Sequence, residues 1–269
     1  MSVIKLAFVL LSVACVSVGR TGRRDVTRRR NRPRLNIIEG DGGCRRQMFI
    51  DVLCRPLELM NYDLCADVEE CIMGQDFGKF FSLITAIFQV IVGDVSKDTE
   101  ESSQQTIQLS KIKRHEDYDS YSMENDIALL KLSKAISFDS NVDKIAICTT
   151  QMAPDSGSCT AAGWGYTSET GTYSTVLQKV TLPIVSWETC SRNYDDADQN
   201  DFDTRLKPGM FCAGATGKDT CQGDAGGPLV CNDKLTGVAS WGYGCGRANY
   251  PEVYADVCYN SGWIQSNAV

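Results

Sequence analysis

The stretch CQGDAGGPLVC, from Cys221 to Cys231, decides the expected fold, and its last residues form one of many short apolar runs. Similar runs of four to ten residues follow one another beyond residue 88: FQVIVGD, QTIQLSKIKR, DIALLKL, TAAGWGY, VLQKVTLPIV, LTGVASWG and PEVYADV. Gly, Pro, Asn and Asp separate these runs, which is typical of an all-β sandwich or barrel. The end of the chain, 259–268, predicts a short helix.

Four motifs identify a family. CQGDAGGPLVC resembles the CQGDSGGPL active-site motif of the chymotrypsin/trypsin serine proteases, and three other motifs follow that family's order and spacing: ENDIALLKL (124–132), AAGWG (161–165) and SWGYGC (240–245). The resemblance covers about residues 88–269 and, briefly, IIEG at 37–40. It implies two antiparallel six-stranded β-barrels with the active site in the cleft between them. HEDYDSYSMENDIALLKL and GKDTCQGD resemble, in particular, trypsins of mites and other arthropods.

The catalytic residues that the resemblance implies are incomplete. Acyl transfer in this family uses a serine, a histidine and a buried aspartate. Asp126 matches the aspartate, but Ala225 stands at the serine position, and a methyl group cannot attack a carbonyl. The single histidine of the chain, His115, matches a surface position away from the cleft. The backbone N–H groups of Gly223 and Ala225 match the oxyanion hole. The sequence therefore predicts a protein that is not an enzyme.

The specificity pocket is also altered. Asp219 matches the acid at the pocket base that selects Arg or Lys, and Ser240-Trp241-Gly242 matches one pocket wall. On the opposite wall Glu252 replaces a glycine of the family, in the run PEVY. A glutamate directed inward would fill the pocket, exclude arginine and share a proton with Asp219. The alternative is a glutamate that turns outward to solvent.

Activation in this family frees an isoleucine ammonium, which then pairs with the aspartate before the serine. The resemblance assigns these roles to Ile37 and Asp224. Asn36 precedes Ile37, so a trypsin-like cut would fall after Arg34 instead. We expect either an asparagine-specific cut or a loop that stays zymogen-like.

Residues 41–87 do not match the family where its histidine motif should lie. Three interpretations stay open: a diverged first barrel, a mis-translated ordinary segment, and a small inserted cysteine-rich module. The segment contains Cys44, Cys54, Cys65 and Cys71, whose pairing the sequence does not predict.

The resemblance implies disulfides elsewhere: Cys190–Cys212, Cys221–Cys245, Cys159–Cys231 and Cys148–Cys258. The loop 94–105 lies where trypsins bind calcium. Asp94 and Glu101 could be ligands, but Gln104 replaces a further glutamate, so an ordinary solvated loop is favoured and no cofactor is expected.

The N-terminal region reads as targeting and processing segments. Residues 1–19 predict a secretory signal peptide, and 20–36, with eight arginines and one aspartate, predict a disordered propeptide before a domain at 37–269. The chain has 13 cysteines, of which Cys15 leaves with the signal, and the even number that remains predicts a secreted, disulfide-bonded protein. The acidic domain argues against nucleic acid, and we expect no membrane anchor.

These observations favour a secreted, inactive serine protease homologue that binds extracellular proteins of plasma, complement or immune cascades as a monomer. Its losses resemble those of inactivated mite protease paralogues. The alternative is an active trypsin-like serine endopeptidase whose recorded sequence is faulty in 41–87 and at 225. An engineered Ser→Ala form would explain Ala225, but neither Glu252 nor the missing histidine.

Overall fold

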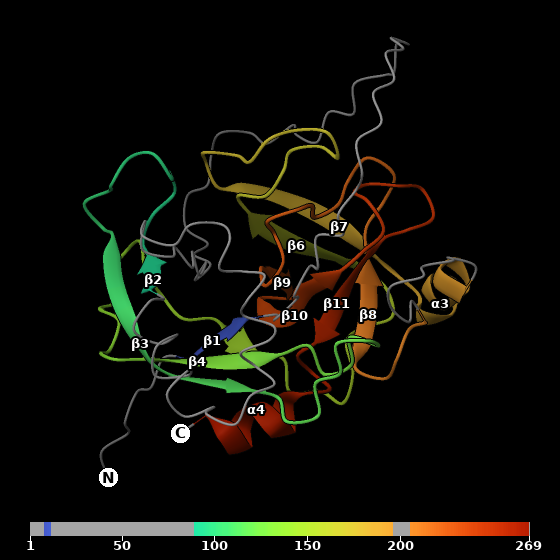
Figure 1. Ribbon diagram of the computed structural model, residues 1–269, viewed down its shortest axis with the longest axis horizontal. Coiled ribbons are helices and arrows are strands. Elements are labelled where there is room, and N and C mark those ends of the chain that lie inside the picture. The colour runs from blue at the N-terminus through green and yellow to red at the C-terminus, as the bar shows by residue number, and fades with distance from the viewer. Residues whose placement is uncertain (1–7, 12–88, 196–204, 269) are drawn as a thin grey trace, which may run out of the picture.

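The computed structural model describes the backbone of residues 8–11 and all of residues 89–195 and 205–268. Two β-sheets and two short helices make up this part of the chain (Figure 1). Ile37, the propeptide and the segment 41–87 lie outside the described residues.

The first sheet has four antiparallel strands in the order β1-β4-β3-β2. Their bounds are Phe8–Leu11 for β1, Gln89–Val92 for β2, Gln105–Arg114 for β3 and Ala128–Leu132 for β4. The alternating pattern of β2 and β3 places every second side chain in a core, as a sheet with one solvated face requires. β1 falls within the predicted signal peptide, whose removal stays a prediction.

The second sheet closes on itself as a six-stranded barrel. Its strands are β6 (Ser158–Gly163), β7 (Gln178–Val185), β8 (Met210–Ala213), β9 (Pro228–Cys231), β10 (Lys234–Trp241) and β11 (Glu252–Asp256). They run in the order β11-β8-β7-β6-β9-β10, and the pairing of β10 with β11 completes the ring. The short strand β5 (Ala146–Ile147) joins β10 in parallel.

The barrel has a dense interior. Leu182, Leu229 and Tyr254 are fully buried there and belong to one apolar cluster with the disulfide Cys159–Cys231. Outside the barrel wall, helix α3 (Trp187–Asp195) packs Tyr194 against Trp241, with ring centroids 4.9 Å apart. Strands β8 and β11 are buried along their whole length because both of their faces are covered in this way.

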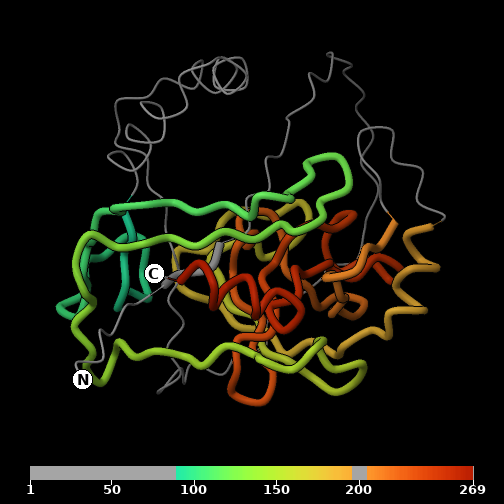
Figure 2. Tube along the Cα trace, turned by 90° about the horizontal axis from the view of Figure 1, so that it is seen from below, coloured from blue at the N-terminus to red at the C-terminus, as the bar shows by residue number. Residues whose placement is uncertain are grey.

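A further apolar cluster joins the two sheets. Ile127 and Leu129 from the region of β4 contact Val238 of β10 and Ile264 of helix α4 (Ser261–Asn267). Helix α4 lies at the lower edge of the molecule in Figure 1 and faces the viewer in Figure 2. The last helix therefore covers the junction between the sheets.

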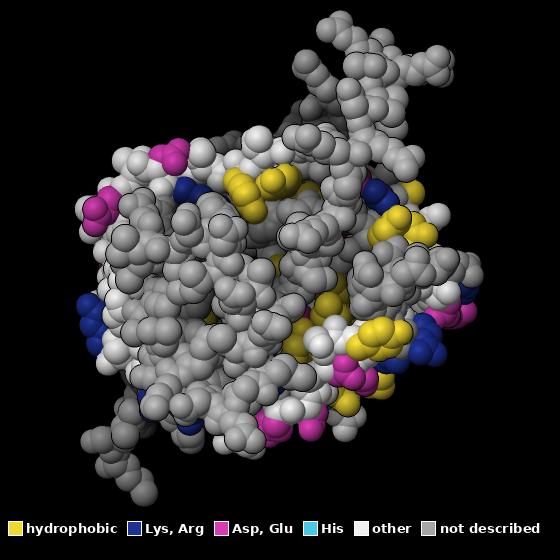
Figure 3. All heavy atoms as spheres, viewed as in Figure 1, with side chains coloured by type: hydrophobic (Ala, Val, Ile, Leu, Met, Phe, Trp, Pro, Cys, Tyr) yellow, Lys and Arg dark blue, Asp and Glu magenta, His cyan; other side chains and the backbone are white. Residues whose placement is uncertain are grey.

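The four disulfides expected from the family resemblance are all present: Cys148–Cys258, Cys159–Cys231, Cys190–Cys212 and Cys221–Cys245. The expected fold class, with its antiparallel barrel and short C-terminal helix, is confirmed. On the described part of the face in Figure 3, hydrophobic side chains lie between acidic and basic ones. No helix among the described residues is both long and apolar enough to cross a membrane.

Candidate active site

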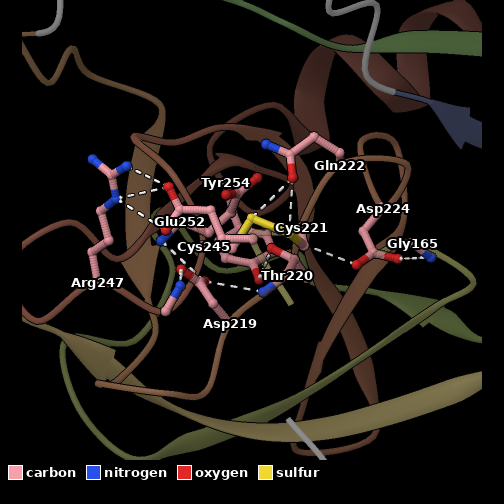
Figure 4. Close-up of a disulfide and its surroundings, with 12 residues drawn as sticks. Gly165, Asp219, Thr220, Cys221, Gln222, Asp224, Cys245, Arg247, Glu252 and Tyr254 are labelled. Atoms are coloured by element: carbon pink, nitrogen blue, oxygen red, sulfur yellow. Dashed lines mark hydrogen bonds and ion pairs between the residues drawn. A yellow bond between two sulfur atoms is a disulfide. The ribbon is translucent and has the colours of Figure 1, made fainter. Parts of the chain in front are cut away.

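Three segments of the second barrel meet at the predicted site. They are the loop 219–227 between β8 and β9, the end of β10 at Ser240–Gly242, and the start of β11 at Glu252. Figure 4 shows the loop, its disulfide and Glu252 together. Asp126, which lies just before β4 of the other sheet, is bonded to Ser240 at the end of β10.

Asp126 is buried and held by a hydrogen bond across the two sheets. The Ser240 hydroxyl donates to Asp126 Oδ2 at 2.6 Å, and the two residues are 5% and 1% exposed. A carboxylate in this arrangement has a fixed orientation, which is the property needed to orient a histidine. The catalytic role of Asp126 stays a prediction. Sequence reasoning treated Ser240 as a pocket wall and missed this bond, because no local pattern links positions 114 residues apart.

The loop around Ala225 is a tight turn. Gly223 and Gly226 have φ values of +94° and +84°, which only glycine adopts without strain. The Asp224 N–H donates to the Cys221 carbonyl at 2.9 Å, and Ala225 is exposed. Within the described residues, the N–H groups of Gly223 and Ala225 donate to no acceptor, as an oxyanion hole would require. Their role stays a prediction.

Asp224 is satisfied by backbone N–H groups. Its Oδ1 accepts from Gly165 at 2.7 Å and its Oδ2 from Cys221 at 3.0 Å. Burial raises the pKa of Asp224, while these two bonds and the charge of Lys97 oppose the shift. A Cβ atom at Gly163 or Gly165 would overlap the Asp224 carboxylate, which explains the glycines of the AAGWG motif. The pairing of Asp224 with the Ile37 ammonium stays a prediction, because Ile37 lies outside the described residues.

Asp219 lies at the base of the pocket, with 5% of its surface exposed. Its carboxylate accepts three backbone N–H bonds, from Thr220 at 3.0 Å, Gly246 at 2.9 Å and Glu252 at 3.3 Å. Burial raises the pKa of Asp219 to about 7 even though these bonds act in the opposite direction. The negative charge of Asp224 adds to the increase.

Glu252 points inward, which rules out the alternative of a solvated side chain. It is 8% exposed, and a Cβ atom built on Gly242 would lie 2.5 Å from Glu252 Oε2. The side chain therefore extends from the Asp219 side of the pocket to the opposite wall. Burial and the neighbouring Asp219 and Asp224 raise the pKa of Glu252 well above its ordinary value. This agrees with the expectation that the two pocket acids hold a proton.

His115 has a structural environment. It is 8% exposed, its ring stacks on Trp263 with centroids 4.6 Å apart, and its Nδ1 accepts from the Asp117 N–H at 3.2 Å. Burial lowers the pKa of His115. The position was expected at the surface, but the contact with α4 buries it. This packing role is different from that of a catalytic base.

Hydrogen bonds within the loop 94–105 stabilise it. Glu101 Oε1 accepts from the Val95 N–H at 3.2 Å, and the Gln104 N–H donates to the Glu101 carbonyl. In residues 89–195 and 205–268, no three His, Cys, Asp or Glu side chains form a group that could hold a metal ion. Whether Asp94 and Glu101 bind calcium stays untested.

Comparisons with known proteins agree with this architecture. The sequence model of a family described as "Trypsin" matches residues 81–264. The chain belongs to the trypsin family. It is 43% identical over 215 residues to "Trypsin-1" of Astacus astacus, an alignment that covers 78% of this chain and 84% of that relative. It is 42% identical over 180 residues to "Trypsin-1" of Salmo salar, covering 66% of this chain and 71% of the relative. "Trypsin-1" of Gadus morhua is 40% identical over 182 residues, with 67% and 72% covered.

These relatives contradict the prediction that the protein is not an enzyme. The prediction rested on Ala225 and on the missing histidine, two local features of the sequence. The relatives are named as trypsins, which are serine endopeptidases, and they match the chain over most of its length. The family relationship is thus to active enzymes, and the particular resemblance to inactivated paralogues is not supported.

Proposed function

We propose that this protein is a trypsin-like serine endopeptidase, and that the printed sequence departs from the catalytic form at position 225 and within 41–87. The observation that carries the proposal is the 43% identity over 215 residues to an enzyme named trypsin. The family match over residues 81–264 includes the segments that build the site, and not only the barrel core.

The geometry around position 225 supports the proposal. A serine at this exposed position would face the N–H groups of residues 223 and 225, which could stabilise the oxyanion of a tetrahedral intermediate. Asp126, held by Ser240, could orient a histidine that takes the proton of the serine hydroxyl. The acids of the pocket, Asp219 and the inward-pointing Glu252, favour a substrate with a basic group.

The proposed activity requires a serine at position 225 and a histidine in the region 41–87. Ala225 has no hydroxyl, and loss of such a nucleophile lowers the rate by roughly a millionfold. His115 is engaged with Trp263, so the base must come from a histidine in the region 41–87, where the family places it. The proposed enzyme is secreted, with a signal peptide at 1–19 and a propeptide at 20–36. Its resemblance to mite and other arthropod trypsins stays a prediction.

The test is to sequence the transcript across codons 41–87 and codon 225, and to assay the protein purified from its natural source. We expect a histidine codon in the first region, a serine codon at 225, and hydrolysis of peptide or ester substrates that a serine-directed fluorophosphonate abolishes. A transcript that encodes Ala225 and no further histidine would overturn the proposal. So would a purified protein of the expected mass without esterase activity.

A further inference from the structure

An ion pair joins two loops that both contact the turn 219–227. Glu169 lies in the loop between β6 and β7, and Arg247 lies in the loop between β10 and β11. Arg247 Nε donates to the two carboxylate oxygens of Glu169 at 3.1 and 3.3 Å, and Arg247 Nη2 also donates to Glu169 Oε1. This forked arrangement is stronger and more directional than an ion pair through a single atom.

Glu169 lies within a short segment, 166–173, that packs on the turn. Tyr166 and Tyr173 form a bridge at the ends of this segment, and their rings meet edge to face with centroids 4.6 Å apart. The Tyr166 N–H donates to the Gln222 carbonyl at 2.9 Å. The Tyr173 ring lies so close to Gly223 that a Cβ atom on this glycine would overlap it. The segment therefore contacts the turn directly before Ala225.

The loop that carries Arg247 holds the same turn from its other end. The Gly246 N–H donates to Asp219 Oδ2 at 2.9 Å, and the disulfide Cys221–Cys245 adds a covalent link (Figure 4). The ion pair therefore completes a ring of contacts, which runs from the segment 166–173 through the turn to the second loop and back.

The Arg247 side of the ion pair is fixed to the barrel. The guanidinium group lies over the Tyr243 ring, 4.5 Å from its centroid. Tyr243 packs edge-on against Tyr250 at 5.0 Å, and Tyr250 packs against the fully buried Tyr194 at 5.6 Å. Gly244 has a φ of +80°, and a Cβ atom there would overlap the Arg247 side chain. Arg247 is thus a fixed point to which the carboxylate of the other loop is bound.

We propose that the Glu169–Arg247 ion pair is a salt-sensitive strap that holds the segment 166–173 against the turn and thereby positions the N–H groups of Gly223 and Ala225. Glu169 and Arg247 are positioning residues, because they act through the segment and the turn. The use of the two N–H groups in catalysis rests on the proposed function, whereas the strap itself does not. The Arg247 and Glu169 side chains are 40% and 35% exposed, so dissolved salt weakens their attraction.

Hydrogen–deuterium exchange of the full chain, followed by mass spectrometry at pH 7, tests the strap. Glu169→Gln keeps the size of the side chain and removes its charge. We expect the backbone amides of 166–173 and 221–227 to exchange about three- to fivefold faster in this variant, as loss of a partly exposed ion pair allows. Unchanged exchange in both segments would overturn the inference.

Glu188→Gln is the matched control. It removes the ion pair of Glu188 with Arg192 on α3, whose nitrogen and oxygen are 3.0 Å apart. The exchange of 166–173 and 221–227 should remain that of the parent. Equal acceleration in the control would contradict a specific role of Glu169. Unchanged exchange of the β7 segment 178–185 in both variants shows that the barrel remains folded.

Salt separates the effect of charge from that of packing. At about 1 M NaCl the Debye length is only about 3 Å, so the strap should loosen in the parent. We expect exchange of 166–173 and 221–227 to increase with NaCl in the parent and in Glu188→Gln, but not in Glu169→Gln. A purely structural role of the Glu169 side chain would not give this difference. The same salt response in the parent and in Glu169→Gln would therefore contradict the strap.

The result does not depend on catalysis. Exchange is measured with Ala225 in place, so the outcome of transcript sequencing leaves its interpretation unchanged. Failure of the exchange experiment would in turn leave the endopeptidase proposal open to its own test.

Discussion

Most buried acids of this barrel are held by backbone N–H groups. Asp219 and Asp224 accept three and two such bonds, and Asp256 accepts them from Ala153, Cys258 and Tyr259 at 2.8 to 3.1 Å. Glu252 is different, because its carboxylate faces a glycine wall and other acids. This single position therefore affects the ionisation of the neighbouring acids.

The pocket acids should make stability depend on pH. The pKa of Asp219 is about 7 in the folded chain, and that of Glu252 is well above its ordinary value, whereas both lie near 4 in an unfolded chain. The folded chain thus keeps protons that the unfolded chain releases between about pH 4 and 7. Because raised acid pKa values favour folding only while the proton is bound, the free energy of unfolding should fall as the pH rises from 5 to 8.

Glu252→Gln tests this expectation. Without the neighbouring charge, the decrease in the free energy of unfolding between pH 5 and 8 should be smaller by about 1 kcal/mol or more. Urea denaturation followed by tryptophan fluorescence measures it at both pH values. Asp256 and His115 titrate in both proteins and cancel in the difference, whereas Asp224 interacts with Glu252 and belongs to the acids that are tested. An unchanged pH dependence would show that the pocket acids do not share their charge in the folded chain.

At the scale of elements, the disulfides differ in the length of chain that they close. Cys148–Cys258 links the end of β5 to the segment after β11 across 110 residues, whereas Cys190–Cys212 links α3 to β8 across 22. All four cysteines are buried, with exposed fractions of 6% or less. Replacing either pair therefore removes similar packing, but it releases very different lengths of unfolded chain from a constraint.

The entropy of loop closure in the unfolded chain predicts which disulfide contributes more to the free energy of unfolding. The double variant Cys148→Ala/Cys258→Ala should lose about 1.4 kcal/mol more free energy of unfolding than Cys190→Ala/Cys212→Ala, because the longer loop restricts the unfolded chain more. Urea denaturation of the two variants and the parent measures the difference. Equal losses, or a larger loss for the shorter loop, would show that native contacts of α3 outweigh the loop term.

For the whole molecule, helix α4 is the element that covers the junction between the two sheets. Ile264 is 4% exposed and lies in one apolar cluster with Leu129 and Val238, which belong to different sheets. Trp263 adds a hydrogen bond to Glu116 at 2.9 Å and the stacking contact with His115. The junction cluster therefore couples the first sheet to the barrel.

Ile264→Ala should weaken this coupling. We expect a loss of about 2–4 kcal/mol in the free energy of unfolding, since the substitution leaves a cavity between the sheets. The exposed neighbour Gln265→Ala is the control and should change stability by no more than about 0.5 kcal/mol. Urea denaturation is followed by circular dichroism and by fluorescence. A loss no larger than that of the control would contradict the coupling role.

Much of this architecture was predictable from local patterns. The runs beyond residue 88 predicted the strands, and the family motifs implied the four disulfides that the structure contains. The position of His115 was less predictable, because its burial depends on a contact with Trp263 from the far end of the chain. The enzymatic class was predicted wrongly, because the prediction rested on two local losses, whereas the relatives match most of the chain.

The sequence by itself determined the family, the barrel strands and the presence of Glu252 in place of a glycine. Periodicity and motif spacing are local properties, and they can be read without knowledge of contacts. Only the tertiary structure decided that Glu252 turns inward against Gly242, that Ser240 holds Asp126, and that backbone N–H groups satisfy Asp224. Each of these results depends on contacts between segments far apart in the chain, and the direction of a flexible side chain is set by such contacts.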